Sequence, residues 1–252
     1  ENSDMEYFPG TIISGCTDPT AINYDSEATS NDGSCYHDVL TDIDGNEYQA
    51  VQINDQLWMK DNLKVTHFNN GDEIPNISYS GDWADASTGA YCEPSDPELY
   101  GYLYNGYAVT NEVSIAPEGW HVPSDEEYTA LTDYLDGESI AGGKMKEAGT
   151  EHWVSPNEGA TNESGFTGLP AGDRNVSGSF SAIGYQAFFW TSTELSEESI
   201  YIRKLRYDNF EIDRDWGGRN DGFSVRCIKN PYAGPTWHVS TDGSDDNNGS
   251  EE

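Results

Sequence analysis

The chain has 252 residues, of which 46 are acidic and 12 are basic, so its net charge is −34. Nucleic acids and anionic membrane surfaces both attract basic segments, and this composition therefore argues against either as a bulk partner. No apolar run is long enough to span a bilayer, which predicts that the chain does not insert into a membrane.

Changes in composition divide the chain into three segments. Residues 1–37 contain too few apolar residues to form a core of their own, so a disulfide or a metal must hold them. Residues 38–230 form the main domain. Residues 231–252 begin as a proline- and glycine-rich linker and then resemble the opening of a right-handed parallel β-helix domain of secreted proteins. A disordered acidic tail is the alternative for this last segment.

The chain has four cysteines, which allow three pairings. Cys16 and Cys35 bracket a short polar segment and most economically pair with each other, which leaves Cys92 to pair with Cys227. Free thiols in the core are the alternative. Two disulfides would place the protein in an oxidising compartment, so we expect it to be secreted or on the cell surface.

Oxygen-bearing side chains gather between the first two cysteines. Calcium takes six to eight oxygen ligands, which Asp and Asn clusters near glycine turns can supply. The sequence therefore predicts calcium as a cofactor, although acidic loops often serve only to keep a protein soluble. The candidate ligands are Asp18, Asn23, Asp25 and Asp32.

The main domain begins with a hairpin pattern and later contains two helical patterns. Residues 47–53 alternate, Asn54 and Asp55 can turn, and residues 56–59 return. Ser124 and Glu127 form a capping box before an apolar stripe, which predicts a helix over 124–135. A weaker helical pattern covers 140–148. Residues 222–227 alternate like a closing strand.

Seven of the twelve basic residues lie in residues 201–230, which carry a charge of +2. With a two-residue turn at Asp208 and Asn209, we expect cross-strand pairs that set the register. The expected pairs are Arg206–Glu211, Leu205–Ile212 and Lys204–Asp213.

The remaining side chains of this segment surround Gly217 and Gly218, where we expect a loop. Aromatic, guanidinium and amide groups are enriched where proteins grip partners. The sequence therefore predicts a ligand-binding face here, with a plain solvated loop as the alternative. The candidate residues are Tyr201, Arg203, Arg214, Trp216, Arg219 and Asn220.

Eight separated motifs occur in an order that closely resembles the Fibrobacter succinogenes major paralogous domain, a bacterial extracellular family. The motifs are residues 42–48, 57–63, 100–105, 118–123, 141–146, 162–166, 189–193 and 222–227. The resemblance implies an α+β, C-type-lectin-like fold with small antiparallel sheets, one or two short helices and long loops. It also implies kinship with formylglycine-generating enzymes, and it implies no known ligand.

The sequence does not show a catalytic constellation. The five histidines are scattered, and neither a zinc-protease motif nor a nucleophile elbow occurs. We therefore expect a bacterial adhesion or recognition protein that binds a glycan or a surface protein without turnover. The alternatives are a subunit of an extracellular filament that assembles with copies of itself, aided by cations, and a phage receptor-binding protein.

Overall fold

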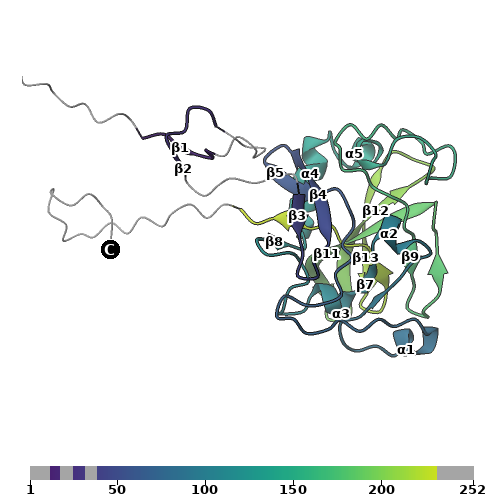
Figure 1. Ribbon diagram of the computed structural model, residues 1–252. Coiled ribbons are helices and arrows are strands. Elements are labelled where there is room, and N and C mark those ends of the chain that lie inside the picture. Colours follow the sequence, from purple (N-terminus) through teal and green to yellow (C-terminus); the bar gives the residue numbers. More distant parts are fainter. Residues whose placement is uncertain (1–11, 18–24, 32–38, 232–252) are drawn as a thin grey trace, which may run out of the picture. The chain divides into compact units, whose positions relative to one another are not determined.

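The computed structural model describes residues 12–17, 25–31 and 39–231 (Figure 1). The chain divides into two compact units, one made of residues 1–38 with 231–252 and the other of residues 39–230. In the first unit, β1 (Ser14–Gly15) pairs in parallel with β2 (Ser30–Asn31). Cys16 follows β1 and is buried. Its predicted partner Cys35 lies outside the described residues, so that pairing stays a prediction.

The second unit is mostly β, with antiparallel sheets and a few short helices. Its first sheet has five strands in the order β3 (Val39–Thr41), β4 (Glu47–Ile53), β5 (Gln56–Met59), β15 (Ile228–Lys229) and β8 (Trp120–His121). The predicted hairpin is confirmed as β4 and β5, and Asn54 takes the left-handed conformation in its turn. Because β15 pairs with β5, the two ends of this unit meet in one sheet.

Two further sheets complete the unit. A five-stranded sheet has the order β10 (Phe180–Ser181), β9 (Asp173–Arg174), β14 (Gly222–Phe223), β7 (Leu103–Asn105) and β6 (Tyr91–Cys92). A three-stranded antiparallel sheet joins β11 (Gln186–Ser196), β12 (Ser199–Arg206) and β13 (Ile212–Gly218). The expected closing strand over residues 222–227 is therefore wrong, because only Gly222 and Phe223 form a strand, β14, and β15 begins at Ile228 in another sheet.

Five helices cross the described part of the unit. Three have a single turn, namely α1 (Ser80–Ala84), α2 (Pro97–Tyr100) and α3 (Gly106–Val109). The predicted capped helix is confirmed as α4 (Asp125–Tyr134), with both hydrogen bonds of the Ser124–Glu127 capping box. The weaker pattern forms α5 (Glu138–Met145), which starts directly after Gly137.

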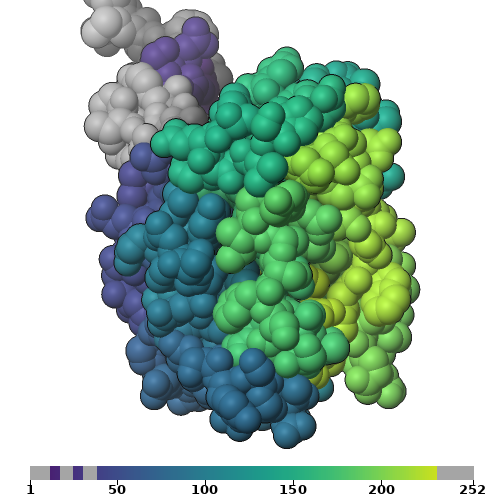
Figure 2. Space-filling model, turned by 90° about the vertical axis from the view of Figure 1, so that its right-hand side faces the viewer, coloured from purple at the N-terminus to yellow at the C-terminus, as the bar shows by residue number. Residues whose placement is uncertain are grey.

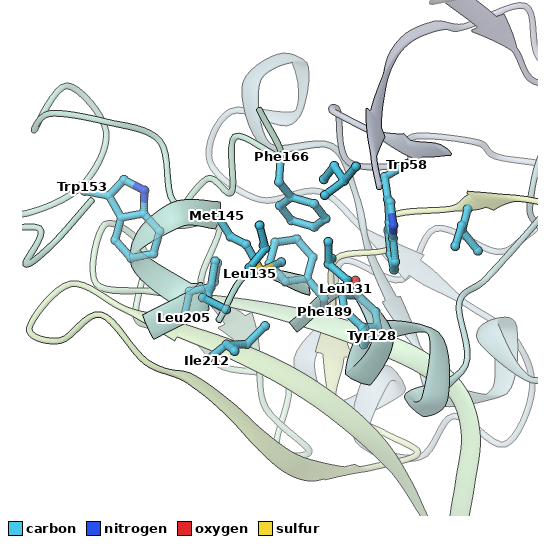
Figure 3. Packing of buried hydrophobic residues seen from close by; sticks show 14 residues of the cluster. Trp58, Tyr128, Leu131, Leu135, Met145, Trp153, Phe166, Phe189, Leu205 and Ile212 are labelled. Atoms are coloured by element: carbon cyan, nitrogen blue, oxygen red, sulfur yellow. The ribbon is translucent and has the colours of Figure 1, made fainter. Parts of the chain in front are cut away.

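The main core lies between these two helices and the three-stranded sheet (Figure 3). Tyr128 and Leu131 of α4 and its C-cap residue Leu135 form the predicted apolar stripe, and each is buried. They pack with Leu205 and Ile212, which lie on the adjacent strands β12 and β13. Burial of such side chains contributes roughly 1.5–3 kcal/mol each, which is the main force that fixes α4 on the sheet.

Buried basic side chains hold the loops between these elements. Figure 2 shows green residues from the middle of the unit lying between blue residues from its first half and yellow-green residues from its end. Lys146 is fully buried, and its Nζ donates to the carbonyls of Glu158, Arg206 and Asn209 at 2.7–2.9 Å. Burial lowers the pKa of Lys146 to about 8. Its three acceptors tie two loops to the end of α5.

Arg226 and Arg174 act in the same way in other places. Arg226 donates to the carbonyls of Phe166 and Thr167, and burial lowers its pKa to about 10. Arg174 donates to the carbonyls of residues 77, 78 and 178. The guanidinium groups thus satisfy carbonyls that have no strand partner.

The predicted disulfide between Cys92 and Cys227 is wrong, because both residues are buried free thiols. Cys92 lies in β6 and belongs to a core cluster with Trp83 and Leu103. Cys227 lies between β14 and β15, where its backbone N–H faces the sulfur of Met59. Burial raises the pKa of both thiols, that of Cys92 to about 11.

Candidate functional site

The predicted ligand face maps onto β12 and β13. In their antiparallel register Tyr201 lies opposite Trp216, and Arg203 lies opposite Arg214. Alternate residues of a strand point to the same side of a sheet, so these four side chains share one face. The expected loop at Gly217 and Gly218 is wrong, since both residues belong to β13.

Arg203 lies under the start of α4. Its side chain is 1% exposed and forms an ion pair with Asp125 at 2.9 Å. The same guanidinium donates to the Asp125 carbonyl at 2.9 Å and to Thr129 Oγ1 at 2.8 Å. Burial lowers the pKa of Arg203, although the nearby carboxylates oppose that shift. The expectation that Arg203 contacts a ligand is therefore wrong, because the helix covers it.

Arg214 contacts the same carboxylate from the outer side. Its Nε lies 3.1 and 2.9 Å from the two carboxylate oxygens of Asp125, and its side chain is 42% exposed. The hydrogen bond that Arg214 donates to Asp125 raises the pKa of Arg214. The guanidinium lies over the ring of Tyr201 at 4.0 Å from the ring centroid, a favourable cation–π geometry. Asp125 and Tyr201 together hold the orientation of Arg214.

Trp216 is the most exposed side chain of the group, at 60%. It lies on a strand that is paired along its length with β12, so its backbone is fixed. The backbone N–H of Trp216 donates to Asp215 Oδ1 at 3.0 Å. Trp216, Tyr201 and Arg214 thus form one continuous patch, which we name the Trp216 surface.

The other two predicted contacts are engaged elsewhere. Arg219 donates to Thr110 Oγ1 at 2.7 Å and forms an ion pair with Glu194. The side-chain amide of Asn220 donates to three carbonyls at the end of α1, those of residues 83, 84 and 86. Both residues therefore connect loops and do not belong to the Trp216 surface.

Each basic side chain of residues 201–219 has a carboxylate partner. The predicted pair Lys204–Asp213 is confirmed at 3.5 Å, and Leu205 lies opposite Ile212 as expected. The predicted pair Arg206–Glu211 is wrong, because Arg206 contacts Asp213 and Asp208. The turn is longer than two residues, since β12 ends at Arg206 and β13 begins at Ile212.

A cavity of about 370 Å³ lies beside the Trp216 surface. The start of α5 and the start of β13 form its walls, and Arg214 belongs both to this cavity and to the Trp216 surface. The sequence could not indicate it, because it arises only where α5 packs on β13. Its lining residues are Glu138, Ser139, Glu211, Ile212, Asp213 and Arg214.

A larger cavity of about 430 Å³ lies where β4 and α2 approach each other. Lys64 and Glu98 on its rim form an ion pair at 2.7 Å. Two of its deep polar groups are already satisfied: Tyr48 Oη donates to Asp42, and Asn62 Nδ2 donates to the Tyr100 carbonyl. Its described lining residues do not include a tryptophan.

Most of the predicted calcium ligands cannot be placed. Asp18, Asn23 and Asp32 lie outside the described residues. Asp25 is described, and its Oδ1 accepts a hydrogen bond from the Glu27 N–H at 2.9 Å. Among the described residues a different group could hold a metal ion: one ligand atom from each of three side chains lies within 4.8 Å of the others. These are Glu147, Glu151 and His152.

One histidine contacts both a hydroxyl and a carboxylate. His67 Nδ1 lies 2.6 Å from Asp44 Oδ1 and 3.1 Å from Thr66 Oγ1. A hydrolase triad uses the two ring nitrogens separately, one for the nucleophile and one for the acid. Here both partners meet the same nitrogen, so this arrangement is not a proton relay. His121 is half-buried and bonded to Glu127 and Asn230.

Comparison with known proteins places the domain but not its ligand. No helix among the described residues has the length and apolarity needed to cross a membrane. No curated protein and no solved structure matches the chain. The family model of the Fibrobacter succinogenes major domain matches residues 51–229. Because this match covers more than half of the sequence, the chain belongs to the Fibrobacter succinogenes major domain family.

Proposed function

We propose that this chain is a non-catalytic recognition protein of the cell surface or the external medium, and that it binds carbohydrate at the Trp216 surface. The observation that carries the proposal is the 60% exposure of Trp216 on a fully paired strand. Tryptophan is among the side chains most enriched at binding surfaces, because its large rigid ring offers an apolar face with a polar N–H at one edge. The rigid backbone reduces the entropy lost on binding.

The surroundings of Trp216 favour a small hydrophilic ligand over a protein. A stable protein interface needs about 800 Å² on each partner and an apolar centre. The side chains next to Trp216 on the same face of β12 and β13 are instead Tyr201, with its polar hydroxyl, and the charged Arg214. A sugar ring offers an apolar C–H face to the indole and hydroxyls to the polar groups around it.

We place the fold in the C-type-lectin-like group. The pairing of β15 with β5, which joins the two ends of the unit, supports this assignment. The position of α4 and α5 against the three-stranded sheet supports it too. A solved structure that superposes on a C-type lectin over both sheets and α4 would test it.

Calcium remains a proposed cofactor of the first unit. Of its four candidate ligands, Asp25 is the one that lies in the described part of the chain. A chelator-reversible rise in melting temperature on addition of calcium would support it. An unchanged melting temperature would remove it.

Trp216→Ala tests the recognition function. We expect the wild-type protein to bind members of a glycan array and the variant to lose at least about thirtyfold in affinity, as is usual for a central aromatic contact. Tyr79→Ala is the matched control, because Tyr79 is 69% exposed and lies directly before α1. Equal binding by Trp216→Ala and the wild type would contradict the proposal.

A further inference from the structure

The charges around the Trp216 surface and the cavity beside it narrow the class of ligand. We infer that the ligand is an uncharged oligosaccharide whose chain runs from Trp216 past Arg214 into the cavity between α5 and β13. This inference rests on the proposed function and deepens it. It adds two statements: the ligand carries no anionic groups, and more than one sugar unit is bound.

The first statement follows from how the nearby basic side chains are used. Proteins bind carboxylate- or sulfate-bearing sugars with free Arg or Lys side chains, because those groups form charge-assisted hydrogen bonds. Here Asp125 occupies the Nε of Arg214, which lies on the same face as Trp216. Arg203 is covered as well. The positive segment seen in the sequence is therefore neutralised where a ligand would lie.

Apart from the Arg214 guanidinium, which is paired with Asp125, the polar groups at the cavity are hydrogen-bond acceptors and a hydroxyl. The side chain of Glu138 is 58% exposed and its carboxylate lies 3.6 Å from Arg203, which leaves lone pairs for a ligand. Ser139 on the α5 wall and Glu211 beside the β13 wall are exposed too. Carboxylates accept hydrogen bonds from sugar hydroxyls and repel anionic sugars, and the net charge of −34 adds to that repulsion.

The second statement follows from the order of groups along β13. Ile212, Arg214 and Trp216 lie on the same face at successive alternate positions, and the first two line the cavity. Alternate residues of a strand are about 6.6 Å apart, which is close to the length of one sugar unit. If one sugar ring stacks on Trp216, the next sugar unit therefore lies over Arg214 and a further unit lies at the cavity. The cavity volume of about 370 Å³ has room for such a unit.

Isothermal titration of the intact protein tests both statements with matched ligands. The neutral probes are tri- and hexasaccharides of β-1,4-glucan, β-1,4-mannan and β-1,4-xylan. The anionic probes are galacturonan and mannuronan oligosaccharides of the same lengths. We expect at least one neutral hexasaccharide to bind about tenfold or more tightly than its trisaccharide and than any anionic probe.

Two variants locate the cavity contribution. Ser139→Phe fills the cavity from an exposed position, so we expect the hexasaccharide to bind no better than the trisaccharide. Glu138→Gln weakens an acceptor without changing its shape, and we expect about three- to tenfold weaker hexasaccharide binding. Ser87→Phe, at an exposed loop position after α1, is the control and should keep the preference for the longer chain. Unfolding curves confirm that each variant is folded.

The contradicting outcomes are distinct. Trp216-dependent binding of an anionic probe, with an affinity that falls as salt is raised, would overturn the inference while the proposed function stands. A preference for the longer chain that Ser139→Phe leaves unchanged would overturn the second statement. Binding of no probe, or binding that Trp216→Ala leaves unchanged, would overturn the proposed function together with the inference.

Discussion

One face of the three-stranded sheet behaves differently at its two ends. At the inner end, Leu205 and Ile212 lie under α4 and α5 and are buried completely or nearly so. At the outer end, Tyr201 and Trp216 lie on the same strands and the same face, and Trp216 is 60% exposed. Alternation along a strand therefore fixes the face of a side chain, whereas helix packing decides whether that face is core or surface.

The boundary between the two ends is the carboxylate of Asp125. Arg203 and Arg214 lie opposite each other, and both contact this carboxylate. The side chain of Arg203 on β12 is 1% exposed, whereas that of Arg214 on β13 is 42% exposed. The same residue type is therefore part of the core on one strand and part of the surface on its neighbour. The first residue of α4 thus closes the core and orients the Trp216 surface.

Removal of that carboxylate should have the largest effect on stability. Asp125→Ala leaves the guanidinium of Arg203 buried with only the more distant Glu138 for compensation, which should cost about 3–5 kcal/mol in the free energy of unfolding. Urea denaturation measures it. In the double variant with Arg203→Met, no unpaired charge remains, and we expect much of the loss to be recovered. A loss below about 1 kcal/mol for Asp125→Ala would show that the contact does not define the boundary.

Truncation of a buried side chain at the inner end should lower the free energy of unfolding by no more than Asp125→Ala does. Leu205 is completely buried, and Leu205→Ala should lower the free energy of unfolding by about 2–5 kcal/mol. Trp216→Ala, on the same face, should change it by no more than about 0.5 kcal/mol, because the ring is mostly solvated. Equal losses in the two variants would contradict the difference between the ends.

The N-cap of α4 should have a smaller effect that reaches both ends. Ser124 Oγ accepts the Glu127 N–H at 3.2 Å, and the Glu127 carboxylate accepts the Ser124 N–H at 2.8 Å. Ser124→Ala should cost about 0.5–2 kcal/mol. Asp125 is the next residue, so we expect its backbone amide to exchange hydrogen faster in the variant than in the wild type. An unchanged exchange rate would show that the cap does not determine the position of Asp125.

The smallest expected effect is a pH dependence at the same helix end. The hydrogen bond to Glu127 raises the pKa of His121, and a bond to Asn230 adds to it. A histidine with a raised pKa contributes stability that is complete below its unfolded pKa of about 6.5 and is lost as the pH rises through its folded pKa. We therefore expect the free energy of unfolding to fall more between pH 6 and 8 in the wild type than in His121→Gln. Parallel curves would contradict it.

The sequence predicts what short-range chemistry determines. The capping box of Ser124 and Glu127 needs only four residues, and the hairpin of β4 and β5 needs a two-residue turn, so both are readable. The register of Lys204 with Asp213 follows from alternation near a turn, although the turn itself is longer than expected.

The remaining features depend on contacts that the sequence does not encode locally. Arg203 is buried because Asp125 reaches it from 78 residues away, and nothing near Arg203 indicates that. Lys146 and Arg226 bind backbone carbonyls, which every residue carries, so no pattern identifies their partners. Cys92 and Cys227 illustrate the same limit, because an even count of cysteines gives no information on their separation in space.

A crystal structure with a bound neutral hexasaccharide tests the central claim most directly. The account predicts a sugar ring stacked on the indole of Trp216, a second unit over Arg214 and a third in the cavity beside Glu138. A saccharide bound elsewhere, such as the cavity beside Lys64 and Glu98, with the indole of Trp216 still open to solvent, would contradict it.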